Sequence, residues 1–212
     1  MTRSVPAAAR RLTQEQRSSS TIAKLMDATI ESLSELGYAN TTTTVVAERA
    51  GVSRGAQLHH FPAKSALVTS AVEYLAVRRI EEFRKRAAAL PQGGDRVSMA
   101  IDLIWSTFSG PLFYAAVELW VAARTDSGLH AILYEMERQI GKAIAAIIQE
   151  SFGDFAGSPR ARDSIQLTLY MMRGMALERI LKNDDTERGQ LLSLWKELMV
   201  RTLDAPAAKA GG

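Results

Sequence analysis

Residues 42–64 have the spacing of two short helices joined by a tight turn. Thr42 and Ser53 each precede a helical stretch and can cap its first turn with a hydroxyl oxygen. Gly51 lies between the two stretches, and glycine accepts the left-handed conformation in which many helices end. Pro62 closes the second stretch, because a proline disfavours helical geometry in the residue before it. The segment therefore predicts a helix-turn-helix, which places its second helix in the DNA major groove.

Two stretches of this segment resemble a known family. A-x-x-A-G-V-S-R-G at 47–55 and H-H-F-P-A-K at 59–64 are similar to the DNA-binding domain of the TetR/AcrR family of bacterial transcriptional repressors. The similarity covers roughly residues 18–70. It implies an all-α fold, with an N-terminal three-helix, homeodomain-like helix-turn-helix domain and a C-terminal six-helix domain for ligand binding and dimerisation.

The helical periodicity of the whole chain agrees with such a fold. Besides the two motif helices, which lie within about 42–61, we expect helices over residues 18–36, 63–89, 95–109, 111–125, 129–151, 158–181 and 184–204. The corresponding domains are a flexible basic arm at 1–17, the helix-turn-helix domain at 18–66, the ligand-binding and dimerisation domain at 67–204 and a disordered tail at 205–212.

Composition indicates a soluble globular protein of the cytoplasm. Hydrophobic residues make up 47% of the 212 positions, but none of their runs reaches the roughly 18 residues of a membrane helix. The first residues lack the apolar region of a signal peptide. With no cysteine and three histidines, the chain offers poor material for a metal site, so we expect no metal and no cofactor.

The net charge of +3 is unevenly distributed. Residues 1–17 hold four arginines and one glutamate, and this surplus of three equals the whole excess. Residues 18–66 hold four basic and four acidic side chains. DNA affinity would therefore depend on a few well-placed cations and on the arm, which is either a solubilising terminus or a segment that contacts phosphates or the minor groove.

The second motif helix supplies the candidates for DNA contact. Arg54 suits bidentate recognition of guanine, and His59 can donate to a base or a phosphate. Gly55 and Ala56 are small enough to let the start of the helix approach the groove. The full predicted DNA-binding set is Thr42, Thr44, Arg54, Gly55, Ala56, Gln57, His59, His60 and Lys64, while Phe61 is expected in the core.

Two of these positions depart from the family pattern. Where the family usually has an apolar residue and then a tyrosine whose hydroxyl contacts phosphate, this chain has Gln57 and Leu58. The side chain of Leu58 has no hydrogen-bond donor for a phosphate, which leaves a thymine-methyl contact or a core role for this residue. Gln57 either reads adenine or bonds a backbone group at the edge of the core. The resemblance implies that Lys64 holds a phosphate.

In the family the inducer binds in a cavity between C-terminal helices. Methionine and aromatic residues at helical spacing are mostly core, yet they also suit a hydrophobic ligand. The predicted ligand-binding residues are Trp105, Phe108, Phe113, Trp120, Met136, Met172 and Met175. Four charged residues within apolar runs are expected to be exposed or ion-paired, with ligand binding as the alternative: Glu118, Arg124, Glu137 and Arg173.

The last expected helix, 184–204, carries apolar residues on two stripes, although one stripe is enough to cover its own domain. Gly174, in the middle of the preceding helix, would let another helix pack closely. We therefore predict a homodimer through a four-helix interface, as the resemblance also implies. The predicted interface residues are Gly174, Leu192, Trp195 and Met199.

These features predict a sequence-specific DNA-binding transcriptional regulator, a homodimeric repressor that a small hydrophobic inducer releases from a palindromic double-stranded DNA operator. An alternative is a helix-turn-helix regulator without small-molecule induction, controlled by a protein partner or acting as an activator. A tightly packed C-terminal domain would favour it. A remote alternative is an all-helical enzyme, but the sequence lacks G-x-S-x-G, H-E-x-x-H and G-x-x-x-x-G-K. We expect no enzymatic activity and no catalytic residues.

Overall fold

The computed structural model describes residues 13–91, 95–152, 159–182 and 185–204. Helices are the only regular elements in these ranges, as the sequence predicts. They are α1 (Gln14–Asn40), α2 (Thr43–Ala50), α3 (Arg54–His60), α4 (Lys64–Ala88), α5 (Arg96–Trp105), α6 (Gly110–Ala123), α7 (Ser127–Phe152), α8 (Pro159–Glu178) and α9 (Asp185–Asp204).

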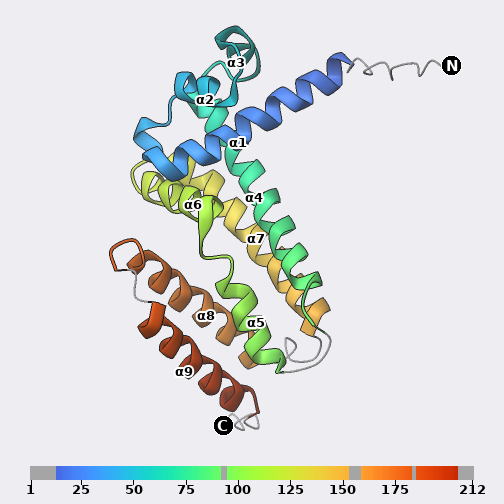
Figure 1. Ribbon diagram of the computed structural model, residues 1–212, viewed down its shortest axis with the longest axis vertical. Helices are drawn as coiled ribbons and strands as arrows, with labels where there is room; N and C mark the ends of the chain where they lie inside the picture. Colours follow the sequence, from blue (N-terminus) through green and yellow to red (C-terminus); the bar gives the residue numbers. More distant parts are fainter. Residues whose placement is uncertain (1–12, 92–94, 153–158, 183–184, 205–212) are drawn as a thin grey trace, which may run out of the picture.

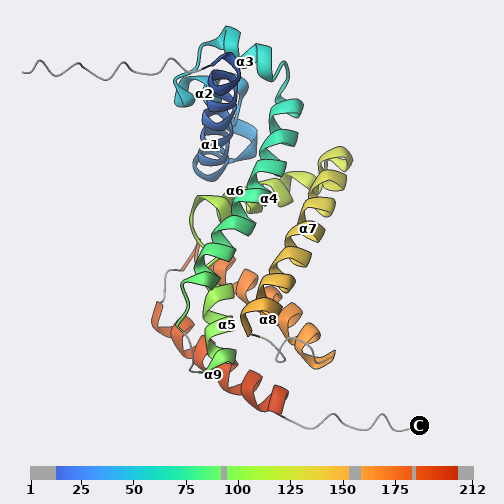
Figure 2. The ribbon, with the colours of Figure 1, turned by 90° about the vertical axis from the view of Figure 1, so that its right-hand side faces the viewer.

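The helices form an elongated molecule with two ends. Helices α2 and α3 lie at one end beside α1, and α5, α8 and α9 lie at the other (Figure 1). Helix α4 runs from the first end toward the second and packs alongside α7, which both ribbon views show (Figures 1 and 2). Helix α6 packs against α1. One helix, α4, therefore connects the helix-turn-helix with the C-terminal helices.

The apolar core continues across the expected boundary at residue 66. Leu25, Val46 and Phe61 belong to a small core under the helix-turn-helix. Leu33, from the second half of α1, is instead packed in a core with Leu119 and other residues of α4, α6 and α7. Because α1 contributes to both cores, movement of α6 or α7 can reach the helix-turn-helix by direct contact.

Helix α1 begins earlier than expected. It starts at Gln14, so residues 14–17, which the sequence analysis placed in the arm, are helical. The cause is a capping box: Thr13 Oγ1 accepts from the Gln16 N–H, and Gln16 Oε1 accepts from the Thr13 N–H. Gly37 leaves helical geometry at φ 77°, one residue after the expected end of this helix, although α1 continues to Asn40. The rest of the predicted arm, the 205–212 tail and the predicted first residues of α8 and α9 lie outside the described residues.

Helix α5 ends four residues earlier than expected, at Trp105, and a turn leads to α6. Gly110 takes φ 77° at the start of α6. Within the described residues, no helix is by itself long and apolar enough to cross a membrane; only α5 and α6 together reach that length and composition, and they are bent by 67°.

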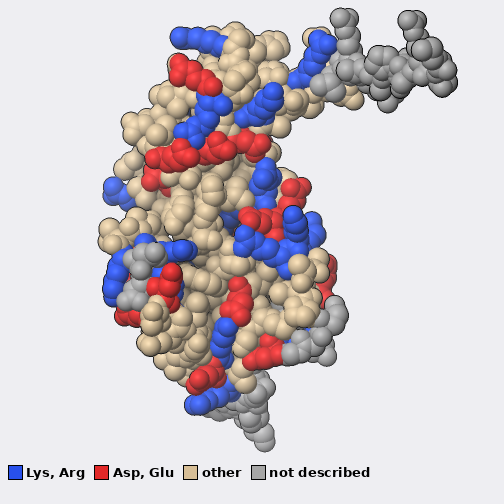
Figure 3. Space-filling view, in the orientation of Figure 1, with Lys and Arg blue, Asp and Glu red and all other residues tan. Residues whose placement is uncertain are grey.

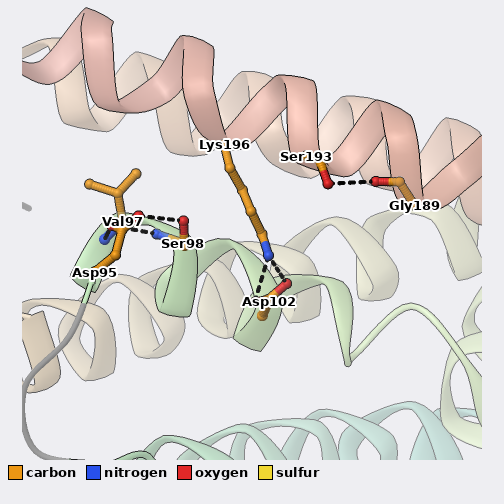
Figure 4. A network of polar contacts seen from close by, with 7 residues as sticks. All are labelled: Asp95, Val97, Ser98, Asp102, Gly189, Ser193 and Lys196. Carbon is orange, nitrogen blue, oxygen red and sulfur yellow. Dashed lines mark hydrogen bonds and ion pairs between the residues drawn. The ribbon is translucent and has the colours of Figure 1, made fainter.

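Polar contacts fix one side of α9 against its neighbours. Lys196 Nζ on α9 lies 2.6 Å from an oxygen of Asp102 on α5 (Figure 4). The start of α5 is itself held by Asp95, which accepts from the N–H groups of Val97 and Ser98. On α8, Thr168 Oγ1 accepts from Trp195 Nε1 at 3.0 Å. The face of α9 that carries Trp195 and Lys196 is therefore turned inward.

Two glycines with positive φ offer a matched test of backbone strain. At Gly37, an added Cβ would lie 3.0 Å from Glu118 Oε2, which accepts the Tyr38 N–H. At Gly51, with φ 61°, a Cβ would meet open space. We expect Gly51→Ala to cost about 1–2 kcal/mol through its backbone alone. Gly37→Ala should cost at least about 1 kcal/mol more, because Gly37, at φ 77° and ψ 169°, has a conformation that almost only glycine adopts, and its new Cβ would also crowd Glu118. Urea unfolding measures both, and equal losses would contradict this difference between the two sites.

Candidate nucleic-acid interface and ligand cavity

The helix-turn-helix is built by the local signals that the sequence predicts. Thr42 Oγ1 accepts from the Val45 N–H at 3.2 Å and starts α2. Gly51 ends α2 in the left-handed conformation at φ 61°. Ser53 Oγ accepts from the Ala56 N–H at 3.2 Å and starts α3. The three residues between α2 and α3 thus set the direction in which α3 leaves the domain.

One face of α3 is open to a partner. Arg54, Gly55, Leu58 and His59 are exposed, and His60 is partly exposed. Arg54 forms none of the ion pairs found among the described residues, so its guanidinium is available. With Gly55 beside it, the start of α3 can approach a groove closely. This face can therefore reach base edges, and base reading by Arg54 and His59 stays a prediction.

The structure removes Gln57 from the predicted DNA-binding set. Its side chain is only 1% exposed, and Nε2 donates to the Phe61 carbonyl at 2.6 Å. This bond satisfies the last turn of α3, because helix ends leave carbonyls without intrahelical donors. Gln57 is therefore the core-edge residue of the two alternatives. Leu58 is 44% exposed, which removes its core role and leaves the thymine-methyl contact as a prediction.

Lys64 joins the start of α4 to the end of α1. Its Nζ donates to the Tyr38 carbonyl at 2.7 Å and lies 4.3 Å from the centroid of the Tyr38 ring. Partial burial lowers the pKa of Lys64. An ammonium group has three donors, so the bond to Tyr38 leaves donors for a phosphate, and that contact stays a prediction.

At the helix-turn-helix end of the molecule, basic and acidic side chains are interspersed. Figure 3 shows separate basic groups around the helix-turn-helix and acidic groups gathered over α1, without a continuous basic surface on this face. Arg49 pairs with Glu35 at 2.7 Å and with Glu31 at 3.7 Å, and its hydrogen bond holds the pKa of Glu35 below its usual range. On this face, individually placed cations rather than a continuous basic patch are available for contacts with DNA.

A cavity of about 430 Å³ lies between α4, α6, α7 and α8. Its apolar lining includes Phe108, Trp120, Leu133, Ile140, Ile144 and Leu169. We call it the α4–α8 cavity. A second hollow of about 920 Å³ beside α1 and α4 is larger and equally open to solvent, but four acidic and three basic side chains line it and several of them pair with one another. The smaller, aromatic-lined cavity is therefore the better candidate for a small-molecule site.

Three charged residues from three helices meet at the α4–α8 cavity. Glu137 on α7 accepts from Arg79 Nη1 at 2.9 Å and from Trp120 Nε1 at 3.2 Å. Arg173 on α8 lies 3.8 Å from Glu137 Oε2, with its guanidinium carbon 4.4 Å from the centroid of the Trp120 ring. Ion pairing of Glu137 and Arg173 is as predicted. Both residues also line the cavity, so ligand binding, the second alternative from the sequence, stays open for them.

The predicted ligand-binding set is only partly placed at this cavity. Phe108 and Trp120 line it. The other five lie in or against the core and outside the cavity lining, so their contact with a ligand stays a prediction: Trp105, Phe113, Met136, Met172 and Met175. Phe113 packs against the two lining rings, with its ring centroid 5.5 Å from that of Phe108 and 6.4 Å from that of Trp120.

Helices α8 and α9 expose a row of large apolar side chains. We call it the α8–α9 apolar face: on α8 and the turn after it Leu167, Tyr170, Leu177 and Leu181, with Gly174 among them, and on α9 Leu191, Leu194 and Leu198. Exposed fractions run from 38% at Leu177 to 92% at Leu181.

The predicted interface residues on α9 face the core of their own chain rather than the α8–α9 apolar face. Met199 is only 4% exposed and is packed in the core, while Leu192 and Trp195 are half-buried against it. The burial of Met199 corrects its assignment to a dimer interface, while an interface role for the half-buried Leu192 and Trp195 stays a prediction. The stripe of α9 that is free to meet a partner contains Leu191, Leu194 and Leu198. Gly174 does lie on the exposed face of α8.

Comparison with known proteins identifies the family. The model for "Bacterial regulatory proteins, tetR family" matches residues 25–71. The HTH-type transcriptional regulator CymR of Pseudomonas putida is 30% identical over 82% of this chain and 87% of its own length. An uncharacterized HTH-type transcriptional regulator of Mycobacterium tuberculosis is 33% identical over 62% of this chain and 68% of its own. The chain belongs to the TetR family.

Membership in the TetR family makes this protein a DNA-binding transcriptional regulator and not an enzyme. The matched residues contain the whole of α2 and α3, the second half of α1 and the start of α4. The solved structure of the multidrug binding protein EbrR complexed with imidazole has the same fold, with a TM-score of 0.58, 18% identity and coverage of 88% of this chain and 97% of that one.

Proposed function

We propose that this TetR-family regulator is a homodimeric repressor that leaves a two-fold symmetric operator when a small apolar ligand enters the α4–α8 cavity. The observation that carries the proposal is the path of α4. Lys64 begins this helix next to α3, and Arg79 lies in the cavity wall on the same helix. The separation is 15 residues, or about 22 Å along a helix. One helix therefore touches both sites.

The α8–α9 apolar face supports the dimer. On α8, positions 167, 170, 174 and 177 recur at steps of three and four, which is the spacing of helices that pack against a partner helix, and Leu181 continues the step in the turn after α8. A two-fold axis through this face would relate two copies of α3. Their separation must match about 34–36 Å for both to enter successive major grooves.

A second contact joins the cavity to the DNA-binding end. Helix α6 carries Trp120, which lines the cavity, and Glu118, which accepts the Tyr38 N–H at 3.0 Å. The carbonyl of Tyr38 accepts from Lys64. A ligand that displaces Trp120 would shift α6 and α4 together and change the spacing of the recognition helices. The volume of the cavity favours this mechanism over a regulator without small-molecule induction.

Ligand and operator are expected to weaken each other's binding. A coupling of about 1–3 kcal/mol is typical, and by thermodynamic linkage the factor is the same in both directions. Calorimetric titration of a cavity-binding compound, with the protein free and then saturated with operator, measures it. Unchanged ligand affinity in the presence of operator would exclude induction and leave the DNA-binding function intact.

Arg54→Ala is expected to remove discrimination at one base pair of the operator, at a cost of about 1–3 kcal/mol there. The reason is that Arg54 is exposed at the start of α3. Fluorescence anisotropy with single-base operator variants gives the measurement. Arg84→Ala, an exposed arginine far along α4, is the control and should keep wild-type discrimination. Equal weakening by Arg54→Ala on every variant would limit Arg54 to phosphate contact.

A further inference from the structure

The charged groups at the α4–α8 cavity do not balance. Arg79 and Arg173 carry two positive charges and Glu137 carries one negative charge, and the other lining residues bring no formal charge apart from a histidine, His130. A surplus of about one positive charge thus remains beside an aromatic wall. The surplus favours a ligand that brings one negative charge.

Glu137 already has its partners. Arg79 Nη1 and Trp120 Nε1 both donate to its Oε1, and Arg173 lies near its Oε2. A cationic ligand would have to displace an arginine to reach this carboxylate. Because buried charges are costly when unpaired, such an exchange would leave the displaced arginine without its counterion.

Arg173 is less well satisfied. Its separation of 3.8 Å from Glu137 is too long for a hydrogen bond. Its Nε is one of two buried side-chain polar atoms without a hydrogen-bond partner among the described residues. Burial also lowers the pKa of Arg173. Orphaned buried donors are rare and costly, so this guanidinium has unused capacity for an acceptor.

We propose that the ligand of the α4–α8 cavity is an aryl carboxylate: a single carboxylate bound by the Arg173 guanidinium and a flat apolar body held between Phe108, Trp120 and Tyr134. The guanidinium fork matches the two oxygens of a carboxylate. Aromatic side chains around the cavity favour a flat body, and about 430 Å³ accommodates one or two fused rings. The inference rests on the proposed ligand-binding function of the cavity.

Binding of matched neutral and charged probes to the full-length protein without DNA tests the proposal. The probes are 2-naphthoate and 4-phenylbutyrate, their primary amides, and the corresponding primary amines, measured by isothermal titration calorimetry. At least one acid is expected to bind tenfold or more tightly than its amide, and its amine should bind more weakly still. Acids that bind no more tightly than their amides, or bind undetectably, would overturn the proposal.

Three variants locate the contact. Arg173→Gln should remove the preference for the acid over the amide. Glu137→Gln should strengthen acid binding severalfold, because it removes the carboxylate that competes for both arginines. Arg138→Gln, a neighbouring exposed arginine paired with Glu135, is the control and should bind the acid as wild type does. Thermal melting verifies that each variant is folded.

The outcomes separate the ligand class from the proposed function. A preference for acids that survives Arg173→Gln, or an acid affinity that falls with Glu137→Gln, would overturn the assignment of Arg173. Amines that bind more tightly than acids would indicate a cationic ligand held by Glu137. An acid that binds as expected but leaves operator affinity unchanged would sustain this inference and exclude ligand-released repression.

Discussion

Replacing Leu177 and Leu194 together by lysine is expected to separate the proposed dimer into folded monomers. Both side chains lie on the α8–α9 apolar face, with exposed fractions of 38% and 52%. In a two-fold interface each substitution occurs twice, so four ammonium groups would lose water on association. Burying these ammonium groups without partners costs a few kcal/mol of association free energy. The dissociation constant of the dimer should therefore rise by about a thousandfold or more. Sedimentation velocity at low micromolar concentration measures the change.

The same double variant should lose most of its operator affinity, because one monomer can occupy only one half-site. Val121→Lys is the matched control. Val121 is 62% exposed on α6, outside the α8–α9 apolar face, so this variant should remain dimeric. A Leu177→Lys/Leu194→Lys protein that sediments as the wild-type dimer would exclude this face as the interface.

Met199→Glu should destabilise the folded monomer itself. Met199 is 4% exposed and is packed in a core formed with α5, α7 and α8. An unpaired carboxylate there is costly, and we expect a loss of about 3–5 kcal/mol. That is a large part of the roughly 5–15 kcal/mol by which a typical domain is stable. Urea unfolding gives the measurement.

The neighbouring substitution, Leu198→Glu, has the opposite expected result. Leu198 is 43% exposed, so the change should alter monomer stability by less than about 1 kcal/mol and weaken the dimer. Together the two variants test the orientation of α9. If Met199→Glu dissociated a dimer of unchanged monomer stability, the original assignment of Met199 to the interface would be restored.

Features encoded within a few residues of one another could be predicted from the sequence. The caps at Thr42 and Ser53 and the left-handed exit at Gly51 involve bonds between residues two to five positions apart, so local chemistry determines them. The start of α1 at Gln14 is encoded locally too, because the Thr13-x-x-Gln16 pattern in the sequence is that of a capping box.

Features that depend on neighbours from distant segments could not be predicted in the same way. Helical periodicity shows that α9 has two apolar stripes, but not that the stripe of Met199 packs on α5 while the stripe of Leu198 stays free. The burial of Gln57 depends on the small core beneath α3. The meeting of Arg79, Glu137 and Arg173 requires three helices to pack, and no sequence spacing indicates it.

Selection of bound duplexes from a random DNA pool by the full-length protein tests most directly whether a symmetric dimer reads DNA through α3. The expected product is an inverted repeat whose half-site centres lie about 10–10.5 base pairs, or a multiple of that, apart. The Arg54→Ala protein should yield the same repeat with one base pair of each half-site no longer specified. A pool without an enriched sequence, or one enriched in a single unrepeated half-site, would contradict a homodimeric regulator.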